Sequence, residues 1–274
     1  MSETLDTGLN EAGAGIVPRA AGAVRGVRAG AVLLPLGLAL LVLLGWEAGV
    51  RLGHVAPVIL PPPSDILAAA WDDRRILLRH AVPTTLESAA GFLIATALGV
   101  ALAVLMTYSR AARQALYPNL VFFQLIPKIA LAPLFLIWFG IGTSSRLAFA
   151  VFIAFFPIVI ATASGLANVD ANMVRLCRSL TGTAWQIFIH VRFPAALPYI
   201  FGGMKIGVTL AIIGVVIGEF ITAQAGLGYL IIFATARADT AVALAAILVL
   251  CLSGLLLFGL VAGAERLAAR RFGA

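Results

Sequence analysis

Long apolar segments recur along the chain and are separated by shorter polar stretches. A helix needs about 20 apolar residues to cross a bilayer core of ~30 Å. Segments of about this length predict an all-α polytopic membrane protein with about six transmembrane helices. The predicted spans are Ala31–Val50, Thr84–Met106, Leu116–Phe139, Arg146–Ala167, Tyr199–Ile221 and Ala241–Ala262.

The connection between the first two spans is too long to be a simple turn. It begins with Pro61-Pro62-Pro63 and continues with Ser64, a good helix N-cap residue. An amphipathic helix is expected over about 64–79, with Trp71 at the outer membrane interface. This helix either packs against neighbouring spans or receives an external partner.

A second long connection, 168–198, keeps a helical apolar pattern although it lies between spans. The pattern runs through Val174, Leu176, Cys177 and Leu180, is interrupted at 181–183, and resumes with Trp185, Ile187 and Phe188. Two short helices with apolar and aromatic side chains are predicted here. They indicate a protein partner; a helix lying on the membrane surface is the alternative.

Composition excludes most other classes of protein. Of 274 residues, 62% are hydrophobic and 11% are charged, and the mean hydropathy is +1.06, whereas soluble domains are ~45–50% apolar and ~25% charged. A soluble enzyme, a disulfide scaffold and a disordered chain are therefore excluded. Residues 31–274 are expected to form one transmembrane domain after a disordered cytoplasmic tail, 1–30. No length remains for a separate soluble domain.

The net charge of +7 is read as an orientation signal. With the N-terminus in the cytoplasm, the outside segments hold Arg51, Arg74, Arg75, Arg79, Arg146 and Arg237. The inside segments hold Arg19, Arg25, Arg28, Arg110, Arg113, Arg175, Arg178, Arg192, Arg266, Arg270 and Arg271. This bias predicts both termini in the cytoplasm. No loop holds a dense basic cluster, so no nucleic-acid partner is expected.

No catalytic, cofactor-binding or metal site is predicted. His54, His80 and His190 stand singly without metal-ligand spacing, and Cys177 and Cys251 are interpreted as small apolar residues. A membrane-embedded lipid-modifying enzyme would need a cluster of His, Asp or Cys residues at one membrane depth, which the sequence does not offer. We therefore do not expect an enzyme.

The loop 168–198 resembles the cytoplasmic signature of permease subunits of ATP-binding-cassette (ABC) importers. That signature reads E-A-A, three residues, G, nine residues, I, one residue, L-P. The same spacing is filled here by Arg175-Leu176-Cys177, Thr181, Val191 and Phe193-Pro194. Arg175 thus replaces the acidic residue and Thr181 the glycine, with Gly182 one step later.

Other segments resemble the binding-protein-dependent permeases for nitrate, sulfonate, taurine, bicarbonate and thiamine-pyrimidine. The resemblance runs from about Pro57 to the C-terminus. The matching segments are Leu60 to Ser64, Pro83 to Leu86, Lys128 to Gly140, Phe155 to Ile158, Trp185 to Phe188, Pro194 to Ile200, Gly218 to Phe220 and Gly226 to Gly228.

The resemblance implies a type I importer permease-like fold in the cytoplasmic (inner) membrane of a bacterium. Two permease copies would form the path as a homodimer, two ATPase subunits would bind ATP and Mg, and an external binding protein would deliver the solute. The helix after Asp170 would be the coupling helix. The coupling residues expected from the signature and the apolar pattern are Arg175, Leu176, Cys177, Arg178, Leu180, Thr181, Gly182, Trp185 and Phe188.

Ionisable residues at membrane depth are functional candidates because inserting a charge there costs about 2.5–3.5 kcal/mol. Lys128 is expected beside Gln124 on the path of an anion; an ion pair with Glu219 or a tilt to the surface is the alternative. Glu219 is a path candidate or an acceptor that holds 226–228. Glu87 is expected at the interface, and Lys205 to reach the lipid headgroups.

The fifth predicted span carries glycine pairs that let helices approach closely. Gly207, Ile213 and Gly214 are wall candidates for the path, and tight helix packing is the alternative. Together these features predict the permease subunit of an ATP-driven importer of a small anion such as nitrate, a sulfonate or bicarbonate. An ion-coupled secondary carrier is the alternative, although such a carrier has no need of the long cytoplasmic loop.

Overall fold

A computed structural model describes residues 23–222 and 224–272 of the chain, and all regular elements among them are helical. The chain divides into two units, at His54 and Val55. The first contains α1 (Ala23–Leu52). Residues 1–22 of the predicted tail lie outside the described residues, while 23–30 already belong to α1. Alanine, valine and arginine, without an interrupting proline there, make that early start favourable.

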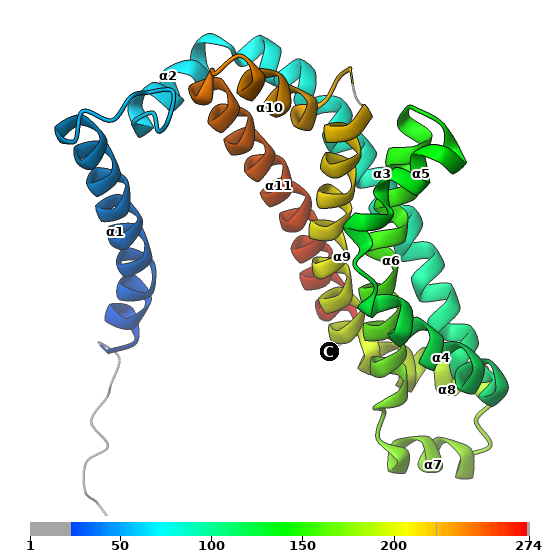
Figure 1. Cartoon of the computed structure of the whole chain (residues 1–274). Helices are drawn as coiled ribbons and strands as arrows, with labels where there is room; N and C mark the ends of the chain where they lie inside the picture. The colour runs from blue at the N-terminus through cyan, green and yellow to red at the C-terminus, as the bar shows by residue number, and fades with distance from the viewer. Residues whose placement is uncertain (1–22, 223, 273–274) are drawn as a thin grey trace, which may run out of the picture. The chain divides into compact units, whose positions relative to one another are not determined.

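The second unit contains all the other described elements (Figure 1). Its long helices are α3 (Arg74–Tyr108), α6 (Thr143–Ala167), α9 (Phe193–Thr222) and α11 (Thr240–Phe272). Shorter ones are α2 (Pro63–Asp72), α4 (Arg110–Leu125), the 3₁₀-helix η1 (Lys128–Leu131), α5 (Ala132–Phe139), α7 (Ala171–Ser179), α8 (Ala184–Ile187), the π-helix η2 (Phe188–Arg192) and α10 (Leu227–Ala236).

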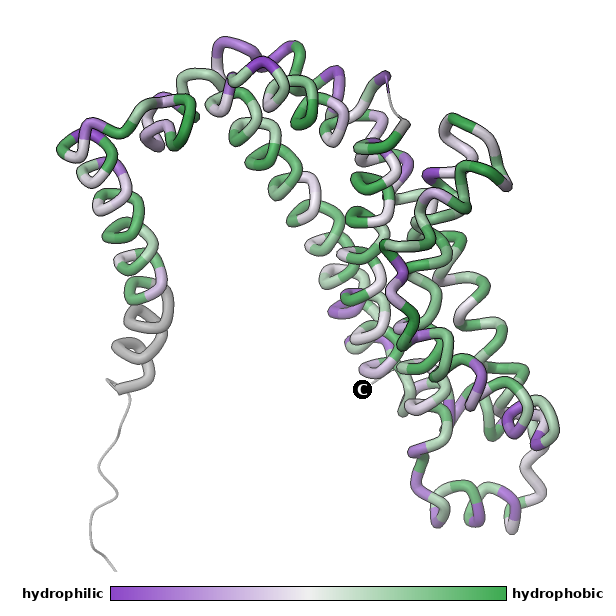
Figure 2. The backbone as a smooth tube through the Cα atoms, viewed as in Figure 1, coloured by the Kyte–Doolittle hydropathy of each residue, from purple (hydrophilic) through white to green (hydrophobic). Residues whose placement is uncertain are grey.

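Five described helical segments are long and apolar enough to cross a membrane, and a bent pair would make a sixth. Figure 2 shows hydrophobic residues along most of α3, α6, α9 and α11, with hydrophilic residues near helix ends and on α7. This arrangement agrees with the predicted all-α polytopic fold. We call the two ends of the bundle in the second unit the α7 end and the α10 end, after the short helices that lie there (Figure 1).

The predicted span Leu116–Phe139 is not one helix. It is divided into α4 and the η1–α5 segment, which meet at an angle of 90°. Pro127 lacks an amide hydrogen, and the preceding Ile126 takes an extended conformation with ψ 134°. Pro127 therefore breaks the span that the sequence analysis predicted as a single helix.

The predicted amphipathic helix over 64–79 also differs from the structure. It is divided at Asp73, so 74–79 form the first turns of α3, which continues through Pro83 to Tyr108. In α2, Ile66 is buried and Trp71 is exposed. Arg74 donates from Nη1 to the carbonyl oxygen of Trp71 at 2.7 Å, joining the two helices.

The core lies where α6 packs between α3 and α9. Ile158 of α6 is fully buried among Phe92, Val208 and Ala211. On α9, Gly203, Gly207, Gly214 and Gly218 all face α6, since a Cβ atom at any of them would lie 2.6–2.8 Å from an atom of that helix. Only glycine permits this approach, so the contact between α6 and α9 depends on this face.

A short helix that the sequence analysis did not anticipate, α10, follows α9. Its ten residues are too few for a span, and Leu227, Leu230 and Ala234 are buried against the bundle. The helix crosses the end of the bundle between α9 and α11 (Figure 1).

The glycine face of α9 can be tested by adding one methyl group. Gly214→Ala should destabilise the protein by about 1–3 kcal/mol, because the new Cβ would lie 2.8 Å from the Cα of Ala150. Gly202→Ala is the matched control, since nothing lies within 4 Å there. It should be neutral or stabilising by up to about 1 kcal/mol, as alanine favours helix. Thermal unfolding in detergent measures both; equal shifts would refute the close contact.

Candidate functional site

The loop at the α7 end presents apolar side chains on its surface. Asp170 caps α7 by accepting a hydrogen bond from the amide of Asn172 at 2.8 Å. From this loop Leu176, Leu180 and Trp185 project outward, with 55, 71 and 63% of their surfaces exposed. Arg175 and Arg178 are also exposed, whereas Cys177 is half-buried. The predicted short helices thus exist, and these three apolar side chains are mostly exposed.

The turn after α7 is built from the residues that depart from the importer signature. The amide of Gly182 donates to the carbonyl of Cys177 at 2.9 Å, and that of Thr181 to Arg178 at 3.0 Å. These two bonds form a Schellman motif, whose left-handed position glycine usually occupies. Here Thr181 takes that position with φ +61°. Its branched side chain makes the turn strained.

Gly182 is also fixed by geometry. A Cβ atom there would lie 2.7 Å from the carbonyl oxygen of Cys177, which would disrupt the Schellman bond. The adjacent Thr183 begins α8 with a capping box in which its side chain and that of Gln186 bond reciprocally to the backbone. The loop is therefore tightly specified between α7 and α8.

One predicted coupling residue, Phe188, does not belong to the exposed set. Only 9% of its surface is exposed, and its ring packs 5.7 Å from Tyr108 and 6.1 Å from Phe193, between ring centroids. Trp185 stacks on it at 5.8 Å with an interplanar angle of 17°. Phe188 therefore supports Trp185 from within the chain. Periodicity alone did not distinguish these two aromatic residues.

The chain from α8 enters α9 without leaving the helix. Phe188–Arg192 form a π-helical turn between them. Such a turn holds one extra residue and is frequent at functional sites. The expected second loop helix is therefore continuous with the fifth span.

Lys128 lies at the break in the third span. Its Nζ donates to the carbonyl of Gln124, the last turn of α4, at 2.9 Å, and lies 5.4 Å from the ring centroid of Phe156. The break at Pro127 frees such carbonyls, and a cation at a helix C-terminus is favourable. Lys128 is half-buried and Gln124 is exposed. The alternative of an ion pair between Lys128 and Glu219 is wrong, because Glu219 bonds elsewhere.

The other predicted wall residues are divided between two roles. Gly207 and Gly214 are buried against α6, in agreement with the packing alternative. Ile213 is 42% exposed on the same helix. Only Ile213 of the three presents a side chain outside the bundle.

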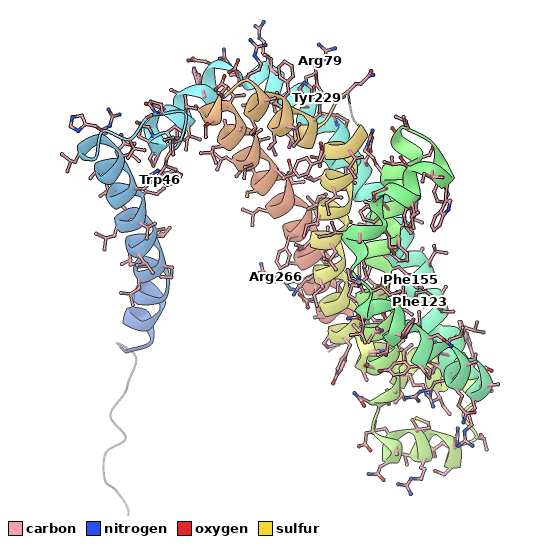
Figure 3. All side chains as sticks on the ribbon, viewed as in Figure 1. Trp46, Arg79, Phe123, Phe155, Tyr229 and Arg266 are labelled. Atoms are coloured by element: carbon pink, nitrogen blue, oxygen red, sulfur yellow. The ribbon has the colours of Figure 1, made fainter. Side chains whose placement is uncertain are left out.

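Glu219 is a buried acceptor at the α10 end. Its Oε1 accepts from the hydroxyl of Thr84 at 2.7 Å and its Oε2 from the amide of Gly228 at 2.7 Å. Thr84 accepts from the amide of Leu227 at 2.8 Å. His80 Nδ1 accepts from the amide of Gly226 at 3.1 Å and stacks on Tyr229, which Figure 3 labels on α10. The second interpretation of Glu219, an acceptor that holds 226–228, describes this geometry.

Glu87 and Arg146 form a buried ion pair that the sequence analysis missed. The guanidinium donates to both carboxylate oxygens, at 2.6 and 2.8 Å, and the two residues are 8 and 9% exposed. Glu87 is therefore buried between α3 and α6. The pair joins α3 to α6 across 59 positions of sequence, a separation that no local pattern reveals. Lys205, expected to reach the headgroups, pairs with Glu265 at 2.5 Å.

A known protein family matches most of the chain. The model of the family described as "Binding-protein-dependent transport system inner membrane component" matches residues 95–270. An inward-facing structure of the methionine ABC transporter MetNI shares the fold, with a TM-score of 0.62 and 19% identity over 71% of this chain and 97% of the matched chain.

Individual relatives carry names of different transport systems. The riboflavin transport system permease RibX of Chloroflexus aurantiacus is 35% identical and covers 86% of this chain and 89% of its own length. The formylaminopyrimidine transport permease ThiX of Halalkalibacterium halodurans is 34% identical, covering 83% and 91%. SsuC of Bacillus subtilis, named for aliphatic sulfonates, is 30% identical and covers 76% of each chain.

The acceptor role of Glu219 can be separated from a requirement for its charge. Glu219→Leu should destabilise the protein, because the amide of Gly228 would be left buried without a hydrogen-bond partner. Each buried polar group that loses its partner costs about 1–3 kcal/mol. Glu219→Gln should cost much less, because its amide oxygen can still accept from Gly228. Thermal unfolding and hydrogen exchange at the amides of 227 and 228 measure the difference; equal losses would contradict the acceptor role.

Proposed function

Because the chain belongs to the family of binding-protein-dependent transport system inner membrane components, which are ABC transporter permease subunits, we propose that it forms the path of an importer for a small anionic solute. The chain carries no ATPase domain of its own in this proposal. ATP and Mg are bound by separate ATPase subunits, and an external binding protein supplies the solute. The working unit is a homodimer surrounded by lipid.

The α7 end is the surface that the ATPase binds. Leu176, Leu180 and Trp185 are exposed there on one short loop, and a group of exposed apolar side chains is typical of a surface that binds a protein partner. A helix seated in a groove through such anchors can transmit movement. The ATPase subunits are cytoplasmic in this assembly, so the α7 end lies on the cytoplasmic side. The C-terminus of α11 lies on the same side, because the ring centroid of Phe272 is 5.9 Å from that of Phe193 at the start of α9. The N-terminus is assigned to that side from the arginine bias alone.

The observation that carries the solute assignment is Lys128 at the break of the third span. Its one recorded hydrogen bond uses one of three ammonium hydrogens, and it stands level with the middle of α6, beside Phe156. A cation held at membrane depth attracts an anion with little competition from water. Exposed Gln124 lies one turn earlier and offers an amide to the same solute.

A flat heteroaromatic solute is the second candidate, because Phe156, the ring beside Lys128, belongs to a cluster of aromatic side chains. Phe123 lies 6.4 Å from Phe156 in a stacked arrangement, and Phe152 lies 5.3 Å from it, between centroids. Figure 3 labels Phe123 on α4 and Phe155 on α6 in this region. Flat rings stack on such surfaces, and two relatives are named for riboflavin and a formylaminopyrimidine.

The coupling surface is tested by introducing charge into it. The double variant Leu180→Asp, Trp185→Asp should lose the co-purifying ATPase, since a single interface hot spot is worth about 2 kcal/mol or more, roughly thirtyfold in affinity. Arg266→Asp on α11 is the control for added negative charge at the same end. Phe188 is left intact because it is buried. Undiminished co-purification of the ATPase with the folded double variant would disprove the coupling role.

The solute is tested by ATP-driven uptake in vesicles with the purified partners. Lys128→Met should reduce uptake of an alkanesulfonate, nitrate or bicarbonate by about tenfold or more, because it removes a charge-assisted hydrogen bond. Lys128→Arg should retain much of the uptake, and ATPase assembly should be unchanged in both. Equal uptake by the methionine variant would remove Lys128 from the path. Uptake of riboflavin or formylaminopyrimidine alone would favour the second candidate, and uptake that stops with the proton gradient would favour an ion-coupled carrier.

A further inference from the structure

A basic cleft lies behind the coupling helix at the α7 end. Its larger cavity, of about 460 Å³, is lined by Arg110, Arg113, Arg175, Arg178 and Arg192. An adjoining cavity of about 240 Å³ shares Arg113 and Arg192. These side chains come from the start of α4, from α7 and from η2. The fold therefore gathers arginines from three separate segments around one hollow.

The positive charge of this cleft is not neutralised within the described part of the chain. No carboxylate lines either cavity, and no ion pair is recorded for these five arginines among residues 23–222 and 224–272. Arg175 donates to the side chain of Asn172 at 3.0 Å, which leaves its charge in place. The carboxylate of Asp170, next to the lining residues, is engaged as the cap of α7. The cleft is thus complementary to an anion.

The walls of the cleft are suited to the boundary between lipid and water. The C-terminal ends of the candidate spans Arg74–Tyr108 and Thr143–Ala167 close it, through buried Met106 and Leu166. Tyr117 lies beside Arg113 in the smaller cavity, and tyrosines are enriched at membrane interfaces. Beyond Tyr117, α4 continues into the apolar third span with Val121, Phe122 and Leu125 exposed. An anion bound in the cleft could therefore extend an apolar tail along α4.

We propose that this cleft binds the phosphate headgroup of an anionic phospholipid, with its acyl chains along α4. Arginine recognises phosphate through two parallel hydrogen bonds, and basic pockets at the ends of membrane helices bind anionic headgroups. An acidic segment of the ATPase is the rival occupant. The apolar continuation along α4 favours the lipid, since a protein segment from the cytosol gains nothing from a wall that rises into the bilayer. The bound lipid ties the start of α4 to the coupling helix.

The test uses the full-length permease alone, in detergent, and measures lipid retention by native mass spectrometry. Wild-type protein should retain phosphatidylglycerol in preference to phosphatidylcholine. The cleft variant Arg110→Gln, Arg113→Gln, Arg192→Gln should bind phosphatidylglycerol at least about tenfold more weakly, as each arginine near an anionic lipid surface contributes severalfold. The control Arg266→Gln, Arg270→Gln, Arg271→Gln removes an equal charge from the C-terminal part of α11, where Figure 3 labels Arg266. Helix α11 carries none of the cleft arginines, so this control should bind phosphatidylglycerol like the wild type.

Three results would overturn the proposal. One is equal retention of the two lipids by wild-type protein, a comparison that needs no folded variant. Another is unchanged phosphatidylglycerol binding by the cleft variant, combined with loss of the ATPase when the same variant is co-purified with it in a separate experiment. That result would assign the cleft to the protein partner. The last is displacement of phosphatidylglycerol by inorganic phosphate at equal concentration, which would assign it to a soluble anion. Transport is not measured, so failure here is distinct from failure of the proposed function.

Discussion

The close contact between α6 and the glycine face of α9 is the constraint on which the rest of the second unit depends. Helices in a membrane gain nothing from hiding apolar surface from one another, because lipid is equally apolar, so packing and satisfied polar groups must hold them together. The four glycines of α9 that face α6 supply the packing. The bidentate pair of Glu87 and Arg146, which joins α3 to α6, supplies the polar bond. These two contacts hold α6 between α3 and α9, so the middle of the bundle is stable whichever side chains its two ends expose.

The two ends of the helical bundle differ in which side chains they bury and which they expose. At the α10 end Thr84 and Glu219 are buried, and together with His80 they hold the backbone of 226–228 by hydrogen bonds. At the α7 end apolar side chains are exposed and arginines stand without carboxylates among the described residues. A closed, internally satisfied end needs no partner to be stable, whereas an open end reserves its contacts for another molecule. This asymmetry supports the proposal that the ATPase binds at the α7 end.

The long helices, the loop with its two short helices and the glycine face follow from local patterns, because hydrophobic length, cap residues and small-residue spacing are written in adjacent positions. Other features depend on distant neighbours. Phe188 and Trp185 have the same helical pattern, and Phe188 is the buried one because Tyr108 and Phe193 pack against it. Glu87 meets Arg146 through the fold, and α10 is too short and too apolar to be separated from its surroundings by pattern. Pro127 is visible in sequence, but the 90° bend is seen only in the fold, where α4 and α5 each contact α6.

The π-helical turn Phe188–Arg192 stands at the entrance to α9. A π turn contains one residue more than an α turn, so its conversion to α-helix shifts everything before it by one position. One position corresponds to about 100° of rotation around a helix. Such a step would swing Trp185 and the attached α7 about the axis of α9 as a ratchet, without melting any part of the span.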